Sequence, residues 1–460
     1  MRTVLIACCA GVFIMPLMST MMNLALVDIG MDFGVGADDL ALVNTIFLLG
    51  SVVAMVPLAR ISDIVGRKKI FIFGLVITAV CSVVAAFSPH FYVLLAMRFG
   101  MGAGSAAVSL TSVAMLTEVF PFERRGWAIG MQTAVIYCGS AVGPAFGGFI
   151  CELLGWKEIF FFILPFTFLS MIFILRFKKE IRPCEGACMD YGGAFLFGAT
   201  VLVTMFGAMC LPDPLALIPI AAGLVMFYYF MKKMKRTESP VLDFSIFRYK
   251  VFSRSCIAAY MNYASSFSVS FFMALYLQSI GALTPMQAGA VIMIQPAVQV
   301  VLTAVFGSRS DRMKDKRILP TLGMVATCAG VFMIMFLDTA VDFLYVGMIL
   351  VTLGVGYGAF SAPNTNAVMS SVPPKHRGEA SGMVALLRQL GMMTSMTVAM
   401  CTISIVMGSA ASLGPSTPEL FGSFITVIRI AFAVCFVMCV IGTAVSWFRG
   451  NNPEGISEFK

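Results

Sequence analysis

The chain has 460 residues, of which 59% are hydrophobic and only 12% are charged, with a formal net charge of +8. Water-soluble domains carry roughly 25% charged residues, so this composition excludes a soluble globular protein and indicates a membrane protein. The sequence contains no Gly-Lys-Ser or Gly-Lys-Thr, and the lack of this phosphate-binding signature argues against an ATP-driven pump.

A membrane-spanning helix needs about 20 mostly apolar residues, and the sequence predicts fourteen such segments. In chain order they cover residues 4–27, 40–58, 70–87, 91–116, 127–151, 159–177, 192–210, 215–231, 252–280, 288–306, 319–337, 344–369, 382–407 and 424–448. The seventh and eighth segments are joined by a very short connection, Leu211-Pro-Asp-Pro214. Losing either of them would reverse the orientation of every later segment.

Lysine and arginine gather in alternate connections, at 67–69, 124–125, 178–182, 232–250, 309–317 and 375–377, whereas the intervening connections are mostly acidic. Basic loops stay on the cytoplasmic side. We therefore expect a multi-pass protein of the plasma membrane with both termini in the cytoplasm. These loops explain the net positive charge by contact with anionic lipid headgroups, so we expect the lipid bilayer, and no nucleic acid, as a partner.

Most of the thirteen cysteines lie inside apolar segments, where a thiol behaves as a small hydrophobic group. Cys184 and Cys188 share one cytoplasmic loop, but a lone pair lacks the further ligands that zinc requires. We therefore expect free thiols, no metal site and no cofactor.

Polar stretches at 178–190 and 232–250 divide the chain into an N-terminal six-helix bundle (1–185), a two-helix insert (186–236) and a C-terminal six-helix bundle (237–460). The turn Arg60-Ile-Ser-Asp-Ile-Val-Gly-Arg-Lys-Lys69 recurs in blurred form at Gly307 to Arg317, which indicates duplication. Duplicated halves of six helices are a known transporter layout that holds the substrate near mid-membrane. The expected fold is an all-α membrane protein, and we expect a transporter and not an enzyme.

Three segments resemble motifs of the major facilitator superfamily, and the resemblance covers nearly the whole chain. Asp63-Ile-Val-Gly-Arg-Lys68 resembles its loop motif between helices two and three, and Leu95-Ala-Met-Arg-Phe-Gly-Met-Gly102 resembles its fourth-helix motif with an intramembrane arginine. Gly139-Ser-Ala-Val-Gly-Pro-Ala-Phe-Gly-Gly148 resembles its fifth-helix antiporter motif, the most specific of the three. The resemblance implies the major facilitator fold.

Further segments resemble the fourteen-helix drug:proton antiporter branch of that family, the EmrB/QacA-like efflux permeases. They are the stretch from Tyr276 to Gly289, the stretch from Pro374 to Gly382, and Leu387-Arg-Gln-Leu-Gly391. The first helix departs from the branch pattern, because Met18 stands where an aspartate is usual and Val27 where a proline is usual.

The two basic turns are candidate conformational locks. In the first turn, Asp63 can accept hydrogen bonds from backbone N–H groups at a nearby helix N-terminus, and Gly66 permits a turn that a larger residue would strain. The lock residues are Asp63, Gly66, Arg67 and Lys68, with Asp311 and Arg312 in the second copy. Ordinary anchoring of basic residues at the headgroups is the alternative for the cations.

The fifth segment places small residues on one face at four-residue spacing, so that another helix can approach closely. These residues are Gly139, Gly143, Gly147 and Gly148, and Pro144 among them removes one backbone donor. By resemblance the motif marks exporters rather than importers. Plain helix packing remains an alternative reading.

Arg98 lies about seven residues into its span, where a charge is costly and normally faces a cavity or a partner. The family resemblance implies a part in proton coupling. The predicted spans carry no Asp or Glu at their centres, so Asp28, Glu118 and Glu152 at span ends are the nearest candidates for the coupling residue. Each can also be a solvated end residue. The missing acid weakens a claim for cationic substrates.

The substrate cavity is expected among polar and aromatic residues on otherwise apolar helices. The candidates are Asn23, Gln132, Tyr137, Tyr260, Asn262, Tyr263, Tyr357, Asn364, Arg388 and Gln389. We expect a monomer that exports small lipophilic or amphipathic compounds, driven by inward proton flow. The alternatives are an exporter of one defined metabolite and a membrane sensor built on a transporter scaffold.

Overall fold

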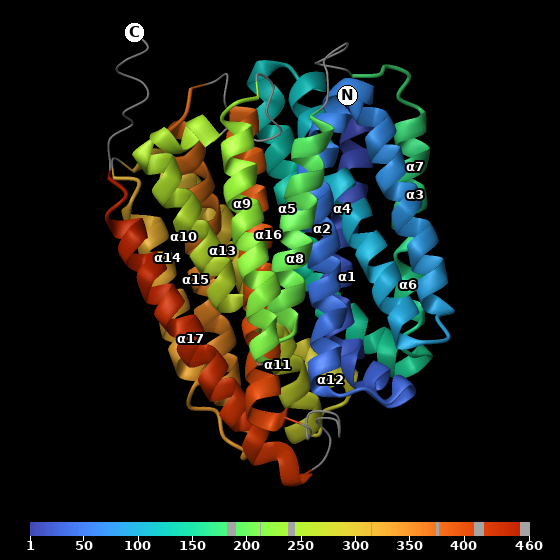
Figure 1. The fold of residues 1–460 in the computed structure, drawn as a ribbon, viewed down its shortest axis with the longest axis vertical. Helices are drawn as coiled ribbons and strands as arrows, with labels where there is room; N and C mark the ends of the chain where they lie inside the picture. The colour runs from blue at the N-terminus through green and yellow to red at the C-terminus, as the bar shows by residue number, and fades with distance from the viewer. Residues whose placement is uncertain are drawn as a thin grey trace. The chain divides into compact units, whose positions relative to one another are not determined.

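The computed structural model describes residues 1–181, 190–211, 213–237, 244–313, 315–373, 377–408 and 418–450. Every regular element in these residues is a helix (Figure 1). Cys184 and Cys188 lie outside the described residues. The chain divides into two compact units, one of residues 1–35 and 39–242, the other of residues 36–38 and 243–460.

The described residues of the first unit form nine α-helices and one short 3-10 turn. They are α1 (Arg2–Phe33), α2 (Ala37–Val65), α3 (Arg67–Ala86), α4 (Phe91–Val119), α5 (Phe122–Leu154), α6 (Glu158–Phe162), α7 (Leu164–Leu175), α8 (Tyr191–Met209), η1 (Pro214–Ala216) and α9 (Leu217–Met234). Helices α8 and α9 lie within residues 186–236, for which an insert was predicted, and belong to the first compact unit. They pack on each other, and Asp190 before α8 pairs with Lys233 near the end of α9 at 2.9 Å.

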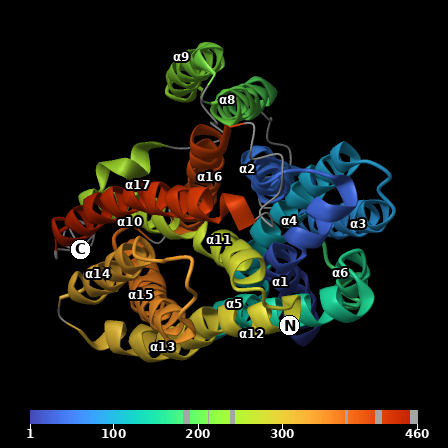
Figure 2. The ribbon, with the colours of Figure 1, turned by 90° about the horizontal axis from the view of Figure 1, so that it is seen from below.

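The second unit contains the remaining helices. They are η2 (Phe244–Arg248), α10 (Lys250–Ser266), α11 (Val269–Leu275), the π-helical turn η3 (Tyr276–Ile280), α12 (Pro285–Ile292), α13 (Ile294–Arg312), α14 (Ile318–Ile334), α15 (Phe343–Ser370), α16 (Arg377–Met407), η6 (Pro418–Leu420) and α17 (Phe421–Trp447). Within this unit, α14 packs against both α15 and α17, as Figure 2 shows.

The described residues contain twelve helical stretches that are long and apolar enough to cross a membrane. This count does not reach the fourteen expected, because two predicted spans are shorter or interrupted. Helix α14 has 17 residues, about 26 Å at 1.5 Å per residue, against a hydrocarbon core of about 30 Å. The predicted span 252–280 is divided into α10, α11 and η3.

The interruption between α10 and α11 has a local cause in a run of serines. Ser265 and Ser266 both bond through their hydroxyl groups to the carbonyl oxygen of Asn262, and such back-bonding bends helices. The backbone N–H of Ser268 donates to the hydroxyl oxygen of Ser395 in α16, at 3.0 Å, instead of to a carbonyl of its own helix.

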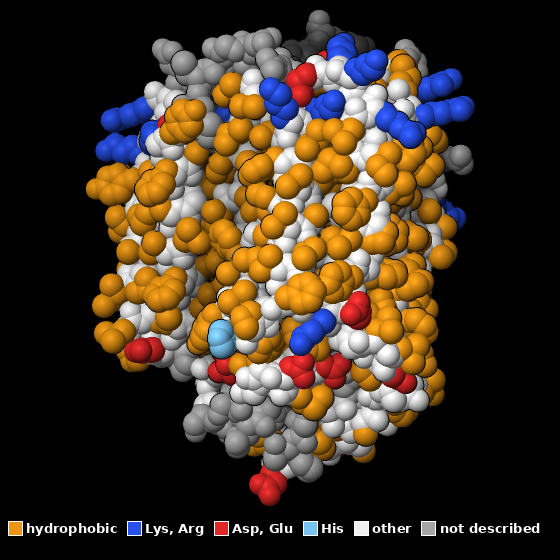
Figure 3. All heavy atoms as spheres, turned by 90° about the vertical axis from the view of Figure 1, so that its right-hand side faces the viewer, with side chains coloured by type: hydrophobic (Ala, Val, Ile, Leu, Met, Phe, Trp, Pro, Cys, Tyr) orange, Lys and Arg blue, Asp and Glu red, His pale blue; other side chains and the backbone are white. Residues whose placement is uncertain are grey.

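Charge is distributed as the loops predict. On the face drawn in Figure 3, hydrophobic side chains cover the middle, most Lys and Arg side chains gather at one end, and most Asp and Glu side chains gather at the other. The described part of the chain is thus that of a multi-pass membrane protein, and the face drawn in Figure 3 has a basic and an acidic end.

Candidate functional site

The turn between α2 and α3 is closed by contacts inside the first unit. Gly66 has φ of 129°, which residues with side chains rarely adopt. Arg67 donates from Nε to Oδ1 of Asp63 at 3.0 Å, and from Nη1 to the carbonyl oxygen of Ala114 in α4 at 3.0 Å. The turn is therefore attached to α4 through Arg67.

The N-terminus of α3 is capped by Glu180, a residue that the sequence did not single out. Its Oε1 accepts the backbone N–H of Lys68 at 2.9 Å and that of Ile181 at 3.2 Å. The backbone N–H of Arg67 donates to the carbonyl oxygen of Ile181 at 3.0 Å, and Lys68 Nζ donates to that of Phe177 at 2.5 Å. The segment after α7 thus satisfies the first amides of α3, where negative charge is favourable.

Asp63 does not make the contact expected of it. The sequence suggested that its carboxylate accepts backbone N–H groups at a helix N-terminus, but in the structure it forms an ion pair with Arg67 at 2.9 Å. Asp63 lies four residues before Arg67, a spacing that brings two side chains together. The helix N-terminus is instead occupied by Glu180, which comes from a distant part of the chain.

The corresponding turn of the second unit lies between α13 and α14. Arg317 donates to both carboxylate oxygens of Asp315, at 3.1 Å from Nε to Oδ1 and at 2.9 Å from Nη2 to Oδ2. The hydrogen bond from this guanidinium holds the pKa of Asp315 below its usual value of 3.8. The side chains of Asp311 and Arg312 lie outside the described part, so their role as a second lock stays a prediction.

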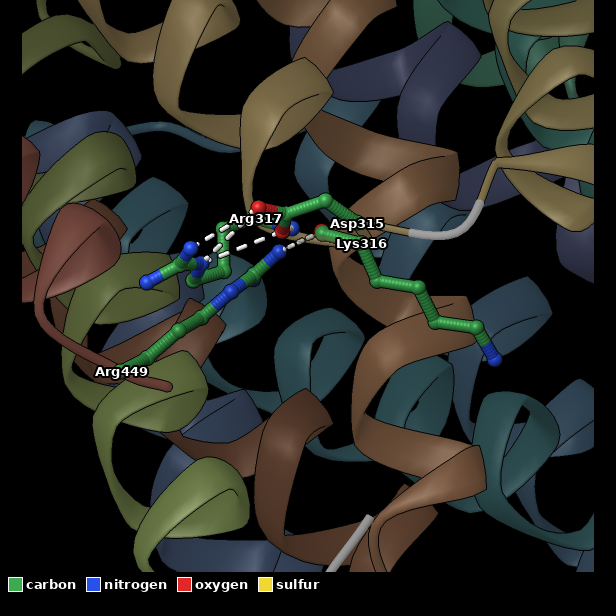
Figure 4. A network of polar contacts seen from close by, with 4 residues as sticks. All are labelled: Asp315, Lys316, Arg317 and Arg449. Atoms are coloured by element: carbon green, nitrogen blue, oxygen red, sulfur yellow. Dashed lines mark hydrogen bonds and ion pairs between the residues drawn. The ribbon is translucent and has the colours of Figure 1, made fainter. Parts of the chain in front are cut away.

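Arg449, the second residue after α17, is buried beside this turn (Figure 4). It donates to the carbonyl oxygen of Lys316 and, at 3.0 Å, to Oδ1 of Asn364 in α15. Burial lowers its pKa to about 10, so it stays charged at neutral pH. Asn364 also donates to the carbonyl oxygen of Ser255 at 3.2 Å. Asn364, a cavity candidate, is therefore engaged in holding this turn.

Arg98 is fully buried in α4 and is surrounded by groups of α2 and α1. It donates from Nε to the carbonyl oxygen of Val43 at 3.1 Å and from Nη2 to Oδ1 of Asn44 at 3.3 Å, with its guanidinium 4.6 Å from the centre of the Phe47 ring. Asn44 in turn donates to Oδ1 of Asn23 at 2.7 Å. The Arg98 Nη1 atom has no hydrogen-bond partner among the described residues.

The candidates for the coupling acid differ in their exposure. Glu118 and Glu152 are exposed, whereas Asp28 in α1 is half-buried. The described residues show no ion pair between Arg98 and any of these three acids. Their roles in coupling stay predictions.

The glycines of the fifth-helix motif face α1. A Cβ atom on Gly143 would lie 1.9 Å from Oγ1 of Thr20, and one on Gly147 would lie 2.6 Å from Cα of Met21. A Cβ atom on Gly139 would lie 3.0 Å from the carbonyl oxygen of Phe13. Gly148 is buried, and Pro144 lies within α5 without ending the helix. The small-residue face thus contacts a neighbouring helix and not lipid.

The cavity candidates of the second unit form an aromatic and polar group on α10, α15 and α16. The rings of Tyr263 and Tyr357 lie 6.1 Å apart, and the Arg388 guanidinium lies 5.9 Å from the Tyr263 ring centre. Tyr357 donates from its hydroxyl to Ser266 at 2.5 Å, and the hydroxyls of Tyr260 and Thr394 are 2.9 Å apart.

The other candidates are less closely grouped. Asn262 is buried and makes a long contact of 3.5 Å with Thr327, and Gln389 is buried in α16. In the first unit, Gln132 is buried and donates to Ser112 at 2.9 Å, and Tyr137 is half-buried.

Several of these partners were not identified from the sequence. Asn44 is the one amide side chain in the apolar segment 40–58, 21 residues after Asn23, and a strongly polar side chain in such a segment is a usable signal. Glu180 and Arg449 give no such signal, because each lies in a polar stretch at the end of a span. The described residues contain no cluster of His, Cys, Asp or Glu that could hold a metal ion.

Comparison with solved structures shows the fold. The chain is similar to a bacterial homologue of the human lysosomal transporter Spinster, crystallised in an inward-facing and unoccupied conformation, with a TM-score of 0.70. The match covers 97% of this chain and 96% of that chain at 16% sequence identity.

Curated relatives cover most of the chain. It is 27% identical over 388 residues to the riboflavin transporter RibZ of Clostridioides difficile (strain 630), covering 84% of this chain and 85% of the relative. It is 27% identical over 399 residues to multidrug resistance protein Stp of Mycobacterium tuberculosis (strain CDC 1551 / Oshkosh), covering 84% and 73%. It is 25% identical over 396 residues to multidrug resistance protein 3 of Bacillus subtilis (strain 168), covering 84% and 77%.

A family model covers most of the chain, including both basic turns. Residues 8–396 match the Major Facilitator Superfamily. With the helical fold and the structural likeness described above, the chain belongs to the Major Facilitator Superfamily.

Proposed function

We propose that this protein is a secondary active transporter that exports small lipophilic or amphipathic compounds by alternating access. The observation that carries the proposal is the close approach of α1 to the glycines of α5, the motif that by resemblance marks exporters. Two relatives named as multidrug resistance proteins support the same substrate class.

The proposal includes fourteen membrane crossings, as in the drug:proton antiporter branch. Helix α14 begins just after the basic residues Lys316 and Arg317 and is followed by the acidic residues Asp338 and Asp342. A helix with a basic loop at one end and an acidic loop at the other crosses the membrane. The interrupted path from α10 to η3 supplies the other crossing, and its broken geometry suits a helix that lines a cavity.

Proton antiport requires an acid that changes its protonation state inside the transporter. Asp28 is our candidate, because it is half-buried in α1 whereas Glu118 and Glu152 are exposed. Arg98 remains charged and acts through a hydrogen-bonded chain of Asn44 and Asn23. Asn23 lies in α1, the helix that also carries Asp28.

A second candidate function is the transport of one defined polar metabolite. The relative named as a riboflavin transporter supports it. The buried network of Arg98, Asn44 and Asn23 also supports it. A site built from amides and a guanidinium discriminates between substrates by hydrogen bonds rather than by apolar contact.

The test uses purified protein in proteoliposomes loaded with a pH-sensitive dye. Addition of a lipophilic compound should release protons from the vesicles in wild-type protein and in Glu118→Gln, but not in Asp28→Asn. Proton movement with riboflavin alone would favour the metabolite carrier. Binding of either compound without any flux would overturn the transport proposal and favour a membrane sensor.

A further inference from the structure

We propose that the groove between α14 and α17 holds an anionic phospholipid, with one acyl chain in the groove and the phosphate at the basic end of the unit. This site belongs to the second unit alone. The two helices lie side by side there (Figures 1 and 2).

The groove has the chemistry of an acyl-chain site. Its volume is about 660 Å³, and its lining includes Val325, Cys328, Phe332, Val440 and Trp447. The threonines that line it make hydrogen bonds within the protein: Thr321 with Ser446 at 2.9 Å, and Thr443 with the carbonyl oxygen of Cys439 at 2.8 Å. The surface that remains to be covered is therefore apolar.

The length of the groove matches one leaflet. On α14 it extends from Thr321 to Phe332, which at a rise of 1.5 Å per residue is about 16 Å. Half of a hydrocarbon core of about 30 Å is about 15 Å. A chain that enters from one membrane surface thus fills the groove and ends near the bilayer centre.

Two arginines lie at the Trp447 end of the groove, whereas the arginine beyond its other end, Arg429, is outside the groove lining and donates to the carbonyl oxygen of Leu337. The Arg317 guanidinium lies 5.7 Å from the centre of the Trp447 ring, and Trp447 lines the groove. Exposed Arg254 donates to the carbonyl oxygen of Phe448, the groove residue that directly follows α17. An anionic headgroup placed at this end meets two guanidinium groups, which bind phosphate oxygens well.

The availability of Arg317 distinguishes this site from a plain apolar surface. Arg317 is already engaged with Asp315 in the turn between α13 and α14, and its side chain remains 32% exposed. A phosphate can therefore share this guanidinium from the membrane side while the turn stays closed. A neutral headgroup of choline type carries its own cation and gains less from the two arginines.

The test is native mass spectrometry of the full-length protein, purified in detergent and supplied with phosphatidylglycerol or phosphatidylcholine of identical acyl chains. We expect retained adducts of phosphatidylglycerol and about fivefold fewer in Arg254→Gln, which corresponds to about 1 kcal/mol for one basic residue at a membrane surface. Arg309→Gln, an exposed arginine of α13, is the charge control and should retain the lipid.

Filling the groove provides a second, independent test. Ala329→Phe and Ala444→Phe each place a ring in the groove at an exposed position, so that the core is not disturbed. Both should lower lipid retention, whereas Val437→Phe, exposed on α17 but outside the groove lining, should not. Equal retention of the two lipids by wild type, or unchanged retention in the Arg254 and groove variants, would overturn the proposal.

Discussion

Replacing Gly66 by alanine tests the construction of the first basic turn. Two effects add at this position. An alanine at this position must adopt φ of 129°, and holding a residue with a side chain in this backbone region costs about 1–3 kcal/mol. The same atom would lie 2.6 Å from Cδ of Glu180, so the carboxylate must leave the N-terminus of α3. Losing a charged hydrogen bond there costs about 1.5–3 kcal/mol, less where water replaces it.

We therefore expect Gly66→Ala to lower the free energy of unfolding by roughly 2–5 kcal/mol, after the small gain that alanine brings by restricting the unfolded chain. The measurement is unfolding of the protein in mixed micelles with increasing dodecyl sulfate, followed by circular dichroism. Two glycines separate the contributions. Gly155 has φ of 95° and Gly130 lies within α5, and a Cβ on either meets no atom within 4 Å.

These controls predict distinct results. Gly155→Ala should show strain alone, about 1–3 kcal/mol, and Gly130→Ala should be neutral or slightly stabilising. In a double-mutant cycle, Gly66→Ala combined with Glu180→Ala should be less destabilising than the sum of the two, because the collision has been removed. Strict additivity, or a Gly66→Ala effect no larger than that of Gly130→Ala, would refute the reasoning.

Three further predictions concern transport and pH. Asp63→Asn removes the ion pair with Arg67 and should abolish export without reducing the amount of protein in the membrane; full export in vesicles would contradict the lock. Gly143→Leu forces α1 away from α5 and should slow transport, and an unchanged rate would contradict the role of this contact. The pKa of Asp315 is lowered in the folded protein, so its stabilising contribution is present above pH 3.8 and is lost as the pH falls below that value. The difference in melting temperature between wild type and Asp315→Asn should stay constant from about pH 8 to 5 and shrink near pH 3; a constant difference throughout would refute this pairing.

The sequence predicted the fold class well because membrane helices are specified locally. Each long apolar segment must satisfy its own backbone hydrogen bonds in lipid, so composition alone locates it. The positions of Gly66 and of the glycines of α5 could also be predicted from the sequence, because a positive φ and a close helix approach both exclude a side chain. The exceptions are α14, which is short, and the span 252–280, which its serines interrupt.

The contacts of the candidate site were less predictable, because they join distant parts of the chain. Glu180 lies more than a hundred residues from the amide it caps, and the sequence offered Asp63 as the nearer acid. Arg449 has the appearance of an ordinary anchor after the last helix, and only the packed structure shows it buried against Asn364. Polar partners that meet through tertiary packing leave no periodic signal in a single sequence.

The position of Glu180 and Arg449 also matters for handling the protein. The first lies in the segment that follows α7, and its carboxylate is attached to the start of α3, so a change at this position alters the start of α3. The second lies two residues beyond α17. A fusion partner or a protease site that replaces the residues immediately after the last helix would therefore remove the hydrogen bond from Arg449 to the carbonyl oxygen of Lys316. Glu180 and Arg449, which lie outside the helices, are thus structural parts of the two basic turns. Truncations designed from helix boundaries alone would damage these turns.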